Sequence, residues 1–441
     1  MEYRERVTDR VLERRLKAFG AVLVTGPKGC GKTTSAKRFS RSVVEFQDED
    51  RRDSYLSVAE VQPSMLLEGE KPRLFDEWQD APKIWGAVRK SVDDTGGKGM
   101  YILTGSTSKP VYTPHSGTLR FSTMKMMPMS LFESGESNGS VSLKSLFDDP
   151  TSYEGCSSDL SMESLIHAIC RGGWPGALGF DDESLGLEIA RDYFRQICGT
   201  DASAVDGVKR NPRLVEAVLR SYSRNICTLA DKKTMMVDVR SVEDVSESTF
   251  HGYVQALERL FVIEDVDAWS PPIRTKGAVR AGKKRNMCDP SLAVAALGLS
   301  PSYFREDFKT LGFLFESLAI RDLKAYSCAS GGAVSYYHDR YGLESDVVLH
   351  LEDGRYALCE VKLGSKEVDK GAENLLKIES LISEHNKEGP RIRPPDLKMV
   401  VTGTEHGYRR DDGVLVVPIG CLRDRRPSGI SRTSPRPPLC A

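Results

Sequence analysis

The sequence is short of three things: long apolar runs, paired cysteines and net charge of either sign. No run approaches the roughly 20 apolar residues that span a bilayer, and the first twenty residues form a charged amphipathic pattern rather than a signal peptide. We therefore expect a cytosolic protein with no membrane segment. The 62 Lys and Arg residues nearly cancel the 63 Asp and Glu residues, so the overall charge favours neither a nucleic acid nor an acidic membrane as partner.

Cysteine and histidine are too scattered to indicate a zinc site. The ten cysteines run from Cys30 to Cys440 without a CxxC pair, and the seven histidines are equally dispersed. Cysteines in this pattern are typical of reduced thiols in a reducing compartment. If the chain holds a metal ion, we expect oxygen atoms as its ligands.

The chain has 441 residues, more than one hydrophobic core normally organises, and its pattern changes along them. In residues 1–135 short apolar runs alternate with helical stretches, which predicts an α/β domain with a parallel sheet. Residues 136–164 are rich in Ser, Gly and Asp and are predicted to be a linker. Helical periodicity dominates residues 165–300, whereas residues 301–422 combine a helix with extended segments. The end, 423–441, is rich in Pro, Ser and Arg and is predicted to be disordered.

A phosphate-binding loop stands in the first domain. The segment AVLVTGPKGCGKTT contains GxxxxGK[ST] between a predicted strand and a predicted helix. Gly26 and Gly31 let backbone amides curl around phosphate oxygens, Lys32 reaches the β- and γ-phosphates, and the Thr33 hydroxyl takes a place on magnesium. Cys30 is either an accessible thiol that reagents can alkylate or a shielded one. The predicted nucleotide-binding residues are Gly26, Pro27, Lys28, Gly29, Cys30, Gly31, Lys32, Thr33 and Thr34.

A second predicted strand, RLFDEW, ends in two adjacent carboxylates. Hydrolysis needs this order, in which Asp76 would hold magnesium through water and Glu77 would polarise the attacking water. A kinase of the same fold has no need of the second carboxylate, so the pair favours hydrolysis over phosphoryl transfer. The next strand, YILTGS, ends in polar residues, and Thr104 or Ser106 could lie between the two acidic side chains and sense the γ-phosphate.

These segments resemble those of a known family. GPKGCGKTT, LFDEWQDAP and YILTGS, with an Arg before PMSLFESGE, are similar to the bacterial and archaeal AAA-superfamily ATP-binding proteins that carry a C-terminal domain of unknown function. RGGWP, CDPSLAVAALG, FLFESL, ESDVVLHL and CEVKLGS extend the resemblance from Tyr3 to about Leu422. It implies ATP and Mg²⁺ as cofactors and ATP hydrolysis as the activity. It leaves DNA or an unidentified protein as a further partner and sets no oligomeric state.

The resemblance also suggests a catalytic arginine. In the AAA superfamily an arginine beyond the sensor strand can touch the γ-phosphate of a neighbouring subunit, and by position Arg120 is the candidate here. The family pattern often reads Gly-Arg where this chain has Leu119-Arg120. The alternative is a surface arginine without a role in the site.

The middle of the chain resembles a winged helix, because two predicted helices precede FVIEDV and KKRNMC. The second helix, about Ser248 to Arg259, would face a DNA major groove with His251, Gln255 and Arg259 exposed. The segment TKGAVRAGKKR, residues 275–285, would be the basic wing. Winged helices also serve as lids on AAA-type ATPases or as protein-binding modules, and runs of charge are usually solvated loops.

The last domain carries a candidate second metal site. Asp346 lies on one predicted strand, Glu360 and Lys362 lie on the next, and Glu316 lies on the helix before them. An EDGR turn joins the two strands into a hairpin, and strand alternation then places Glu360 and Lys362 side by side next to Asp346. The order resembles the PD-(D/E)xK nuclease fold, whose carboxylates hold magnesium while the lysine orients water. The alternative is a charged hairpin face that forms salt bridges with itself.

Three functions fit these patterns. The first is an ATPase that acts as a nucleotide-driven switch on its C-terminal domains. The second is a DNA-associated ATPase with a metal-dependent nuclease at its C-terminal end. The third is a signalling module in which bound ATP holds a closed form and hydrolysis is slow.

Overall fold

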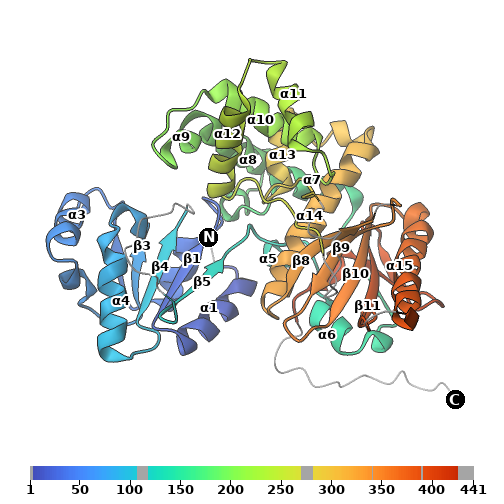
Figure 1. The fold of residues 1–441 in the computed structure, drawn as a ribbon, viewed down its shortest axis with the longest axis horizontal. Helices are drawn as coiled ribbons and strands as arrows, with labels where there is room; N and C mark the ends of the chain where they lie inside the picture. The colour runs from blue at the N-terminus through green and yellow to red at the C-terminus, as the bar shows by residue number, and fades with distance from the viewer. Residues whose placement is uncertain (1–2, 107–117, 270–281, 340, 389–390, 426–441) are drawn as a thin grey trace.

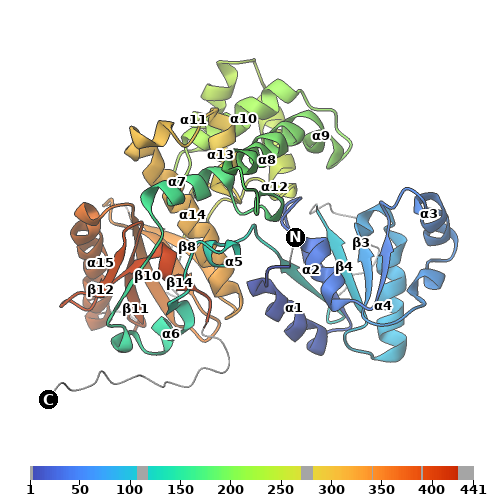
Figure 2. The same ribbon diagram turned by 180° about the vertical axis from the view of Figure 1, so that it is seen from behind.

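The computed structural model describes residues 3–106, 118–269, 282–339, 341–388 and 391–425. Figure 1 shows three lobes: an N-terminal α/β domain, a helical middle lobe and a C-terminal α/β domain. The long helix α14 (Phe308–Cys328) stands between the middle lobe and the C-terminal sheet. Figure 2 shows the same lobes from behind, with the short helix α5 (Leu131–Ser134) near their junction.

The N-terminal domain is built on a parallel sheet with the strand order β2-β3-β4-β1-β5. Its strands are β1 (Ala21–Thr25), β2 (Ser42–Glu45), β3 (Arg73–Asp76), β4 (Tyr101–Gly105) and β5 (Phe121–Lys125). Its helices include α1 (Val7–Ala18), α2 (Lys32–Phe39), α3 (Arg52–Val61), the 3-10 helix η1 (Pro63–Leu67) and α4 (Lys83–Thr95). The predicted parallel α/β sheet is confirmed. Because every strand runs the same way, the carboxyl ends of β1, β3 and β4 meet at one edge.

The middle lobe is helical, as predicted. It contains α7 (Met162–Arg171), η4 (Pro175–Ala177), α8 (Glu183–Gln196), the π-helical turn η5 (Ile197–Asp201), α9 (Ala202–Ala204), α10 (Pro212–Arg224), α11 (Lys232–Arg240), α12 (Glu247–Arg259) and α13 (Pro290–Leu297). Between α12 and α13 the chain forms a narrow antiparallel hairpin, bridged at Ile263–Met287 and at Val266–Lys284. We call residues 262–269 and 282–288 the connector hairpin; residues 270–281 between them lie outside the described part.

The C-terminal domain is a mixed sheet with the order β7-β12-β13-β11-β10-β9-β8. Its strands are β7 (Gly155–Ser157), β8 (Ala333–His338), β9 (Glu344–His350), β10 (Tyr356–Lys362), β11 (Leu397–Thr402), β12 (His406–Arg409) and β13 (Leu415–Pro418), with helices α14 and α15 (Val368–Glu388). The hairpin expected at EDGR is confirmed, because β9 and β10 pair antiparallel with Tyr356 opposite His350. Gly354 in this turn has a φ of 83°, which glycine adopts without strain.

Residues 136–164 do more than link two domains. They form β6 (Val141–Ser142), α6 (Leu143–Asp148) and β7, and β7 joins the C-terminal sheet beside β12. These strands have only two or three residues, too few to show a period in the sequence. Arg423, the first residue of the segment predicted to be disordered, is ordered, because Leu422–Arg423 forms β14 against β6. Residues 426–441 lie outside the described part.

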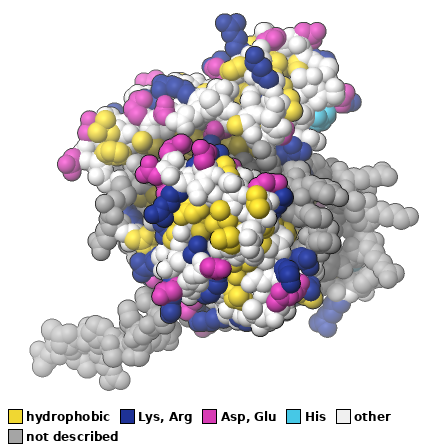
Figure 3. All heavy atoms as spheres, turned by 90° about the vertical axis from the view of Figure 1, so that its left-hand side faces the viewer, with side chains coloured by type: hydrophobic (Ala, Val, Ile, Leu, Met, Phe, Trp, Pro, Cys, Tyr) yellow, Lys and Arg dark blue, Asp and Glu magenta, His cyan; other side chains and the backbone are white. Residues whose placement is uncertain are grey.

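Figure 3 looks onto the side of the N-terminal domain that lies on the left in Figure 1, and hydrophobic side chains gather near its centre. Of the elements in this domain, α3 and η1 carry Val61 and Met65, which are large, apolar and exposed. Among the described residues, no helix combines the length and the apolar character needed to cross a membrane.

Candidate functional site

The phosphate-binding loop connects the end of β1 to the start of α2, as its sequence predicts. Gly26 and Gly31 have φ values of 147° and 101°, and a Cβ on Gly26 would lie 2.2 Å from the Met126 carbonyl oxygen. Lys32 is buried, and its Nζ donates hydrogen bonds to the carbonyl oxygens of Gly26 (3.0 Å) and Pro27 (2.8 Å). The loop therefore has its expected conformation, with the lysine ammonium folded over it.

Asp76 is held by two hydroxyl groups at the carboxyl edge of the sheet. Thr33 Oγ1 donates a hydrogen bond to Asp76 Oδ1 at 2.7 Å, and Thr104 Oγ1 donates to the same oxygen. Burial raises the pKa of Asp76, although the two hydroxyl groups offset part of this effect. Thr104 Oγ1 also accepts a hydrogen bond from the Glu77 amide at 3.3 Å. Of the two residues that the sequence offers for this position, Thr104 and Ser106, Thr104 is the one that contacts both Asp76 and Glu77 through its hydroxyl.

Glu77 has a backbone conformation that is unusual for a residue with a side chain. Its φ and ψ are 53° and 49°, in the left-handed region. The Ser106 hydroxyl donates a hydrogen bond to Glu77 Oε2 at 2.9 Å, and the Gln79 amide donates to the same oxygen. Such backbone strain costs about 1–3 kcal/mol and is retained mostly at functional sites. In this conformation the Glu77 carboxylate contacts Ser106, just beyond the end of β4.

A cavity of about 250 Å³ opens beside the start of α2. Four segments that are distant in the sequence line it, and its residues include Tyr3, Arg6, Thr34, Ser35, Pro175 and Leu178. Arg6 donates one hydrogen bond to the Cys30 carbonyl oxygen and one to the Met127 carbonyl oxygen, both at 2.7 Å, and forms an ion pair with Glu133 at 3.1 Å. The cavity has room for a group the size of a nucleobase next to the phosphate loop. Sequence reasoning missed these N-terminal residues because they belong to no phosphate-binding motif.

The motifs RGGWP and CDPSL, which had no evident chemical role in the sequence, contact one another. The Gly173 amide donates a hydrogen bond to Asp289 Oδ2 at 2.9 Å, and Trp174 Nε1 donates to Ser291 Oγ at 3.0 Å. A Cβ on Gly172 would lie 2.3 Å from Ser291 Oγ, so a side chain there would push the two motifs apart. Their contact holds the segment that begins at Pro175 against the cavity.

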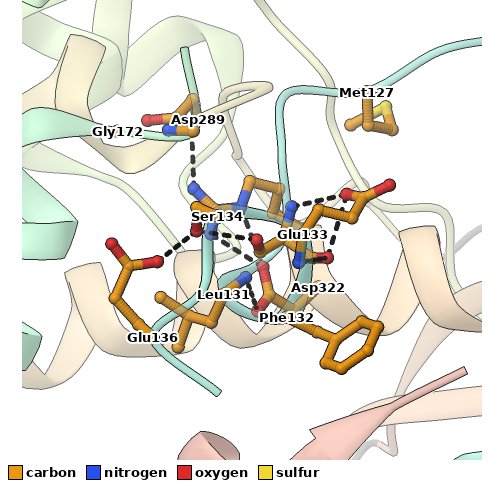
Figure 4. A network of polar contacts seen from close by, with 12 residues as sticks. Met127, Leu131, Phe132, Glu133, Ser134, Glu136, Gly172, Asp289 and Asp322 are labelled. Atoms are coloured by element: carbon orange, nitrogen blue, oxygen red, sulfur yellow. Dashed lines mark hydrogen bonds and ion pairs between the residues drawn. The ribbon is translucent and has the colours of Figure 1, made fainter. Parts of the chain in front are cut away.

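A buried polar network continues from these motifs to the C-terminal domain (Figure 4). Arg321 on α14 forms ion pairs with Asp289 and with Asp322, both at 2.8 Å. Asp322 Oδ2 accepts a hydrogen bond from the Leu131 amide at 2.9 Å, at the start of the helix that contains Glu133. Burial opposes the charge of Arg321, but Asp322 and Asp289 outweigh it and raise its pKa. Because Glu133 pairs with Arg6, the network connects α14 to the cavity beside α2.

The middle lobe also touches the phosphate loop directly. Lys28 Nζ lies 2.7 Å from Asp201 Oδ1, which is on the π-helical turn η5. Cys30 has no exposed surface, and its thiol lies 3.7 Å from the Met126 carbonyl oxygen. Cys30 is thus the shielded thiol of the two alternatives, because the loop packs against the sheet behind it.

The structure does not bring Arg120 to the nucleotide site of its own chain. Arg120 comes just before β5, whose first residue, Phe121, pairs with Ala21 at the start of β1. The phosphate loop begins at the other end of β1, so the arginine lies at the opposite edge of the sheet. There it forms an ion pair with Asp93 at 2.6 Å. A role toward a neighbouring subunit stays a prediction.

The four predicted residues of the second metal site do lie together. Lys362 Nζ is 3.2 Å from Asp346 Oδ2 and 2.6 Å from Glu360 Oε2. Sequence reasoning missed the fifth member, Lys284 of the connector hairpin, whose Nζ is 2.6 Å from Glu316 Oε1 and 3.8 Å from Asp346 Oδ1. Within the described ranges no group of three or more His, Cys, Asp or Glu is arranged for a metal ion. The arrangement differs from the predicted site because an ammonium group lies between two of the carboxylates.

Burial and neighbouring charges both shift the pKa values of the groups in this cluster. Burial raises the pKa of Glu360 to about 8, with a further contribution from Asp346, and raises the pKa of Glu316 to about 7 despite Lys284. Burial would also raise the pKa of Asp346, but Lys284 and Lys362 outweigh it, so this pKa is lowered. The pKa values of both lysines are raised, because the carboxylates outweigh burial. Both ammonium groups therefore stay charged.

Part of the predicted basic wing is buried. Lys284 and Arg285 are buried, and Arg285 forms an ion pair with Asp265. Residues 275–281 of this segment lie outside the described part. On the predicted recognition helix, α12, Arg259 pairs with Asp206 at 3.3 Å. His251 of α12 pairs with Glu247 at 3.6 Å, while Gln255 is exposed. Lys284 and Arg285 therefore cannot contact DNA phosphates in this conformation, which corrects that part of the prediction.

Comparisons with protein families agree with this geometry. Residues 18–134 match an AAA domain, residues 162–303 match a domain of unknown function (DUF8612), and residues 311–422 match another (DUF4143). Residues 18–134 form an AAA domain. An AAA domain implies nucleotide binding, and this one is followed by two domains of unknown function. The resemblance seen in the sequence is confirmed to that extent.

No curated protein matches the chain. Among solved structures, the Walker-type ATPase PABY2304 of Pyrococcus abyssi is 14% identical, with a TM-score of 0.40 over 65% of this chain and 94% of that chain. A DNA replication initiation factor is also 14% identical, with a TM-score of 0.17 over 56% of this chain and 86% of that chain. Neither likeness is close enough to indicate a function.

Proposed function

We propose that this chain is a Mg²⁺-dependent ATPase that works as a nucleotide-driven switch on its C-terminal domains. One observation carries the proposal. The Asp76 carboxylate meets the Thr33 hydroxyl of the phosphate loop at 2.7 Å, and the strained Glu77 stands next to it. An AAA domain with this pair has the groups that both nucleotide binding and water activation need.

The residues at this edge fit magnesium. Thr33 Oγ1 and the Asp76 carboxylate offer only oxygen atoms, which magnesium prefers, and they already lie within hydrogen-bonding distance. Thr33 would bind the ion directly and Asp76 through water. When bound, magnesium neutralises charge on the phosphate oxygens of ATP.

The other groups of the site have separate roles. The amides of the phosphate loop bind phosphate oxygens. Lys32 gives up its hydrogen bonds to the Gly26 and Pro27 carbonyl oxygens and binds the β- and γ-phosphates instead. Glu77 orients and polarises the attacking water, and Ser106 keeps its carboxylate in place. The cavity beside α2 receives the base of the nucleotide.

The position of the site supports the switch. The cavity is lined both by the AAA domain and by Pro175 and Leu178 of the middle lobe, so a nucleotide would touch both lobes. Arg6 and Arg321 connect the cavity through buried ion pairs to α14 of the C-terminal domain. A change in occupancy therefore has a continuous route of packed polar contacts to follow. The nuclease alternative relies on Asp346 and Glu360, beside which the Lys284 ammonium now lies.

The test compares ATP binding and turnover in Lys32→Ala and Glu77→Gln. Lys32→Ala should lose binding, whereas Glu77→Gln should keep binding and lose most hydrolysis, because the magnesium-holding groups remain. Glu45→Gln is the matched control, since Glu45 ends β2 at the same edge but pairs with Lys37 at the surface. Equal loss of binding in both test variants would contradict the role of Glu77. Turnover with and without DNA separates the switch from a DNA-associated enzyme, and slow turnover that DNA leaves unchanged favours the signalling alternative.

A further inference from the structure

The connector hairpin belongs to the middle lobe and contacts both of the other lobes. On its first strand, Glu264 forms ion pairs of 2.8 Å with Lys125, at the end of β5, and with Lys324 on α14. Lys125 pairs in register with Thr25, the residue before the phosphate loop. Burial would raise the pKa of Glu264, but Lys324 and Lys125 outweigh it and lower it to about 2. One carboxylate of the middle lobe thus binds the other two lobes.

The hairpin also extends the C-terminal sheet. The Trp269 amide donates a hydrogen bond to the Tyr336 carbonyl oxygen at 2.6 Å, and the Tyr336 amide donates to Asp267 at 3.1 Å. Tyr336 belongs to β8, the edge strand of that sheet. These contacts place the second strand of the hairpin over the acidic cluster of the C-terminal domain.

Lys284 reaches from that second strand into the cluster. Its backbone pairs with Val266, while its Nζ contacts the Glu316 carboxylate at 2.6 Å, the Asp346 carboxylate at 3.8 Å and the Asp346 carbonyl oxygen at 3.2 Å. Only 4% of Lys284 is exposed. The middle lobe therefore supplies one of the cations of a site whose anions all belong to the C-terminal domain.

The charge balance of this cluster depends on the Lys284 ammonium, which the middle lobe supplies. Three carboxylates, those of Glu316, Asp346 and Glu360, face two ammonium groups. Glu360 is 1% exposed, and neither of its carboxyl oxygens accepts a hydrogen bond from a described residue, so Lys362, at 2.6 Å, is the cation that offsets its charge when the group ionises. Without Lys284, three buried carboxylates would share one ammonium, which is costly in a low dielectric. Oxygen-only ligands with a surplus of negative charge suit a hard divalent cation.

The cluster is also open to solvent through a groove. Glu316 and Lys362 line a groove of about 770 Å³, together with Lys309, Phe313 and Lys366. A cation could therefore reach the carboxylates from the groove, while Lys284 approaches from the hairpin.

We propose that Lys284 is an autoinhibitory residue whose ammonium takes the place of a divalent cation between Glu316 and Asp346. While the connector hairpin is docked, the C-terminal domain binds no divalent metal at this cluster. When the hairpin withdraws, the carboxylates of Glu316, Asp346 and Glu360 take up Mg²⁺ or Mn²⁺. This goes beyond ATP hydrolysis and does not require it.

The test measures Mn²⁺ binding to the full-length, nucleotide-free chain by electron paramagnetic resonance. Lys284→Ala and Lys284→Gln should each bind one more Mn²⁺ per chain than the parent, and adding Asp346→Asn to either variant should remove it. Lys324→Gln is the matched control, because Lys324 is another lysine paired with a carboxylate of this junction but outside the cluster. The control should bind no additional ion.

Several outcomes would overturn the proposal. One is a folded Lys284 variant that binds no more Mn²⁺ than the parent. Another is a parent that already binds Mn²⁺ in a manner abolished by Asp346→Asn. If the Lys284 variants unfold without metal, Mn²⁺ must restore their folded circular dichroism spectrum and raise their melting temperature. Failure of Mn²⁺ to do so in both variants would show that Lys284 is a structural ion-pair partner only.

Discussion

Lys28 of the phosphate loop and Asp201 of the middle lobe form an ion pair of 2.7 Å between Nζ and Oδ1. The Asp201 side chain is 8% exposed, and its other oxygen, Oδ2, has no hydrogen-bond partner among the described residues. Asp201 lies in a π-helical turn, a feature that often marks functional sites. Because Lys28 belongs to the predicted phosphate-binding loop, this pair joins the proposed nucleotide site to the middle lobe.

Removal of Lys28 and removal of Asp201 should destabilise the chain to different extents. Lys28→Met should lower the free energy of unfolding by about 1–3 kcal/mol, because it leaves the Asp201 carboxylate buried without a cation. Asp201→Asn should cost less than about 1 kcal/mol, since the lysine is half-exposed and can turn to water. Urea denaturation of both variants and the double variant measures the difference. A larger loss in Asp201→Asn than in Lys28→Met would contradict this account of the pair.

Thr104 should affect hydrolysis more than nucleotide binding. Its hydroxyl donates to Asp76 and accepts from the Glu77 amide, so it positions both acidic residues. Thr104→Val removes these bonds and should lower kcat by about 10–100-fold, as loss of an outer-shell partner typically does. Thr104→Ser keeps the hydroxyl and should retain most activity. A fall in ATP affinity as large as the fall in kcat would show that Thr104 contributes to binding instead.

Local chemistry made the conformation of the phosphate loop and the position of Asp76 predictable from the sequence. The glycines of the phosphate loop, Lys32 and Thr33 lie within eight positions of the chain, and Asp76 ends a strand whose neighbours are set by a parallel sheet. Geometry then follows from spacing, because the carboxyl ends of parallel strands share one edge. The cavity that lies beside this loop was not predictable, since it needs Tyr3 and Pro175, which only tertiary folding brings together.

The same dependence on tertiary folding explains why the acidic cluster was only partly predictable. The EDGR hairpin places Glu360 and Lys362 next to Asp346, so the sequence was sufficient for these three. The sequence predicts that Lys284 belongs to a basic wing or a solvated loop, because consecutive basic residues are usually solvated. Its burial depends on the docking of the connector hairpin against the C-terminal sheet, a contact between domains that no local pattern records.

Glu360 should make the stability of the chain depend on pH. Its pKa is raised from 4.5 to about 8, mainly by burial, so the folded state binds its proton more tightly than the unfolded state does. The stability that this proton contributes is fully present below pH 4.5 and is lost as the pH rises through about 8. Glu360→Gln carries no such proton. The difference in unfolding free energy between the variant and the parent should therefore grow in favour of the variant from pH 5 to pH 8.5.

Chemical denaturation across this pH range measures the effect of Glu360→Gln. Glu367→Gln is the matched control, because Glu367 follows β10 but is exposed. Its pH profile should coincide with that of the parent. Parallel profiles for Glu360→Gln and the parent would show that Glu360 is ionised in the folded chain, neutralised by Lys362.

Arg6 should be needed both for the shape of the nucleotide cavity and for the stability of the chain. Its guanidinium contacts the Cys30 carbonyl oxygen, the Met127 carbonyl oxygen and Glu133 with three different nitrogen atoms. In Arg6→Lys the charge remains, but a single ammonium cannot reach all three acceptors from one position. The loss of two such bonds should cost about 3 kcal/mol of unfolding free energy. Because Cys30 belongs to the phosphate loop, ATP affinity should fall by about tenfold or more as well.

The control for Arg6→Lys is Arg4→Lys, since Arg4 also lines the cavity but is exposed and donates to the Ser134 carbonyl oxygen alone. Thermal unfolding and equilibrium binding of a fluorescent ATP analogue measure the two effects separately. Arg6→Lys should lose both stability and affinity, whereas Arg4→Lys should change each only slightly. An Arg6→Lys variant with normal stability and normal affinity would show that the charge alone matters at this position. A loss of stability without a loss of affinity would place Arg6 in the support of Glu133 and not in the nucleotide site.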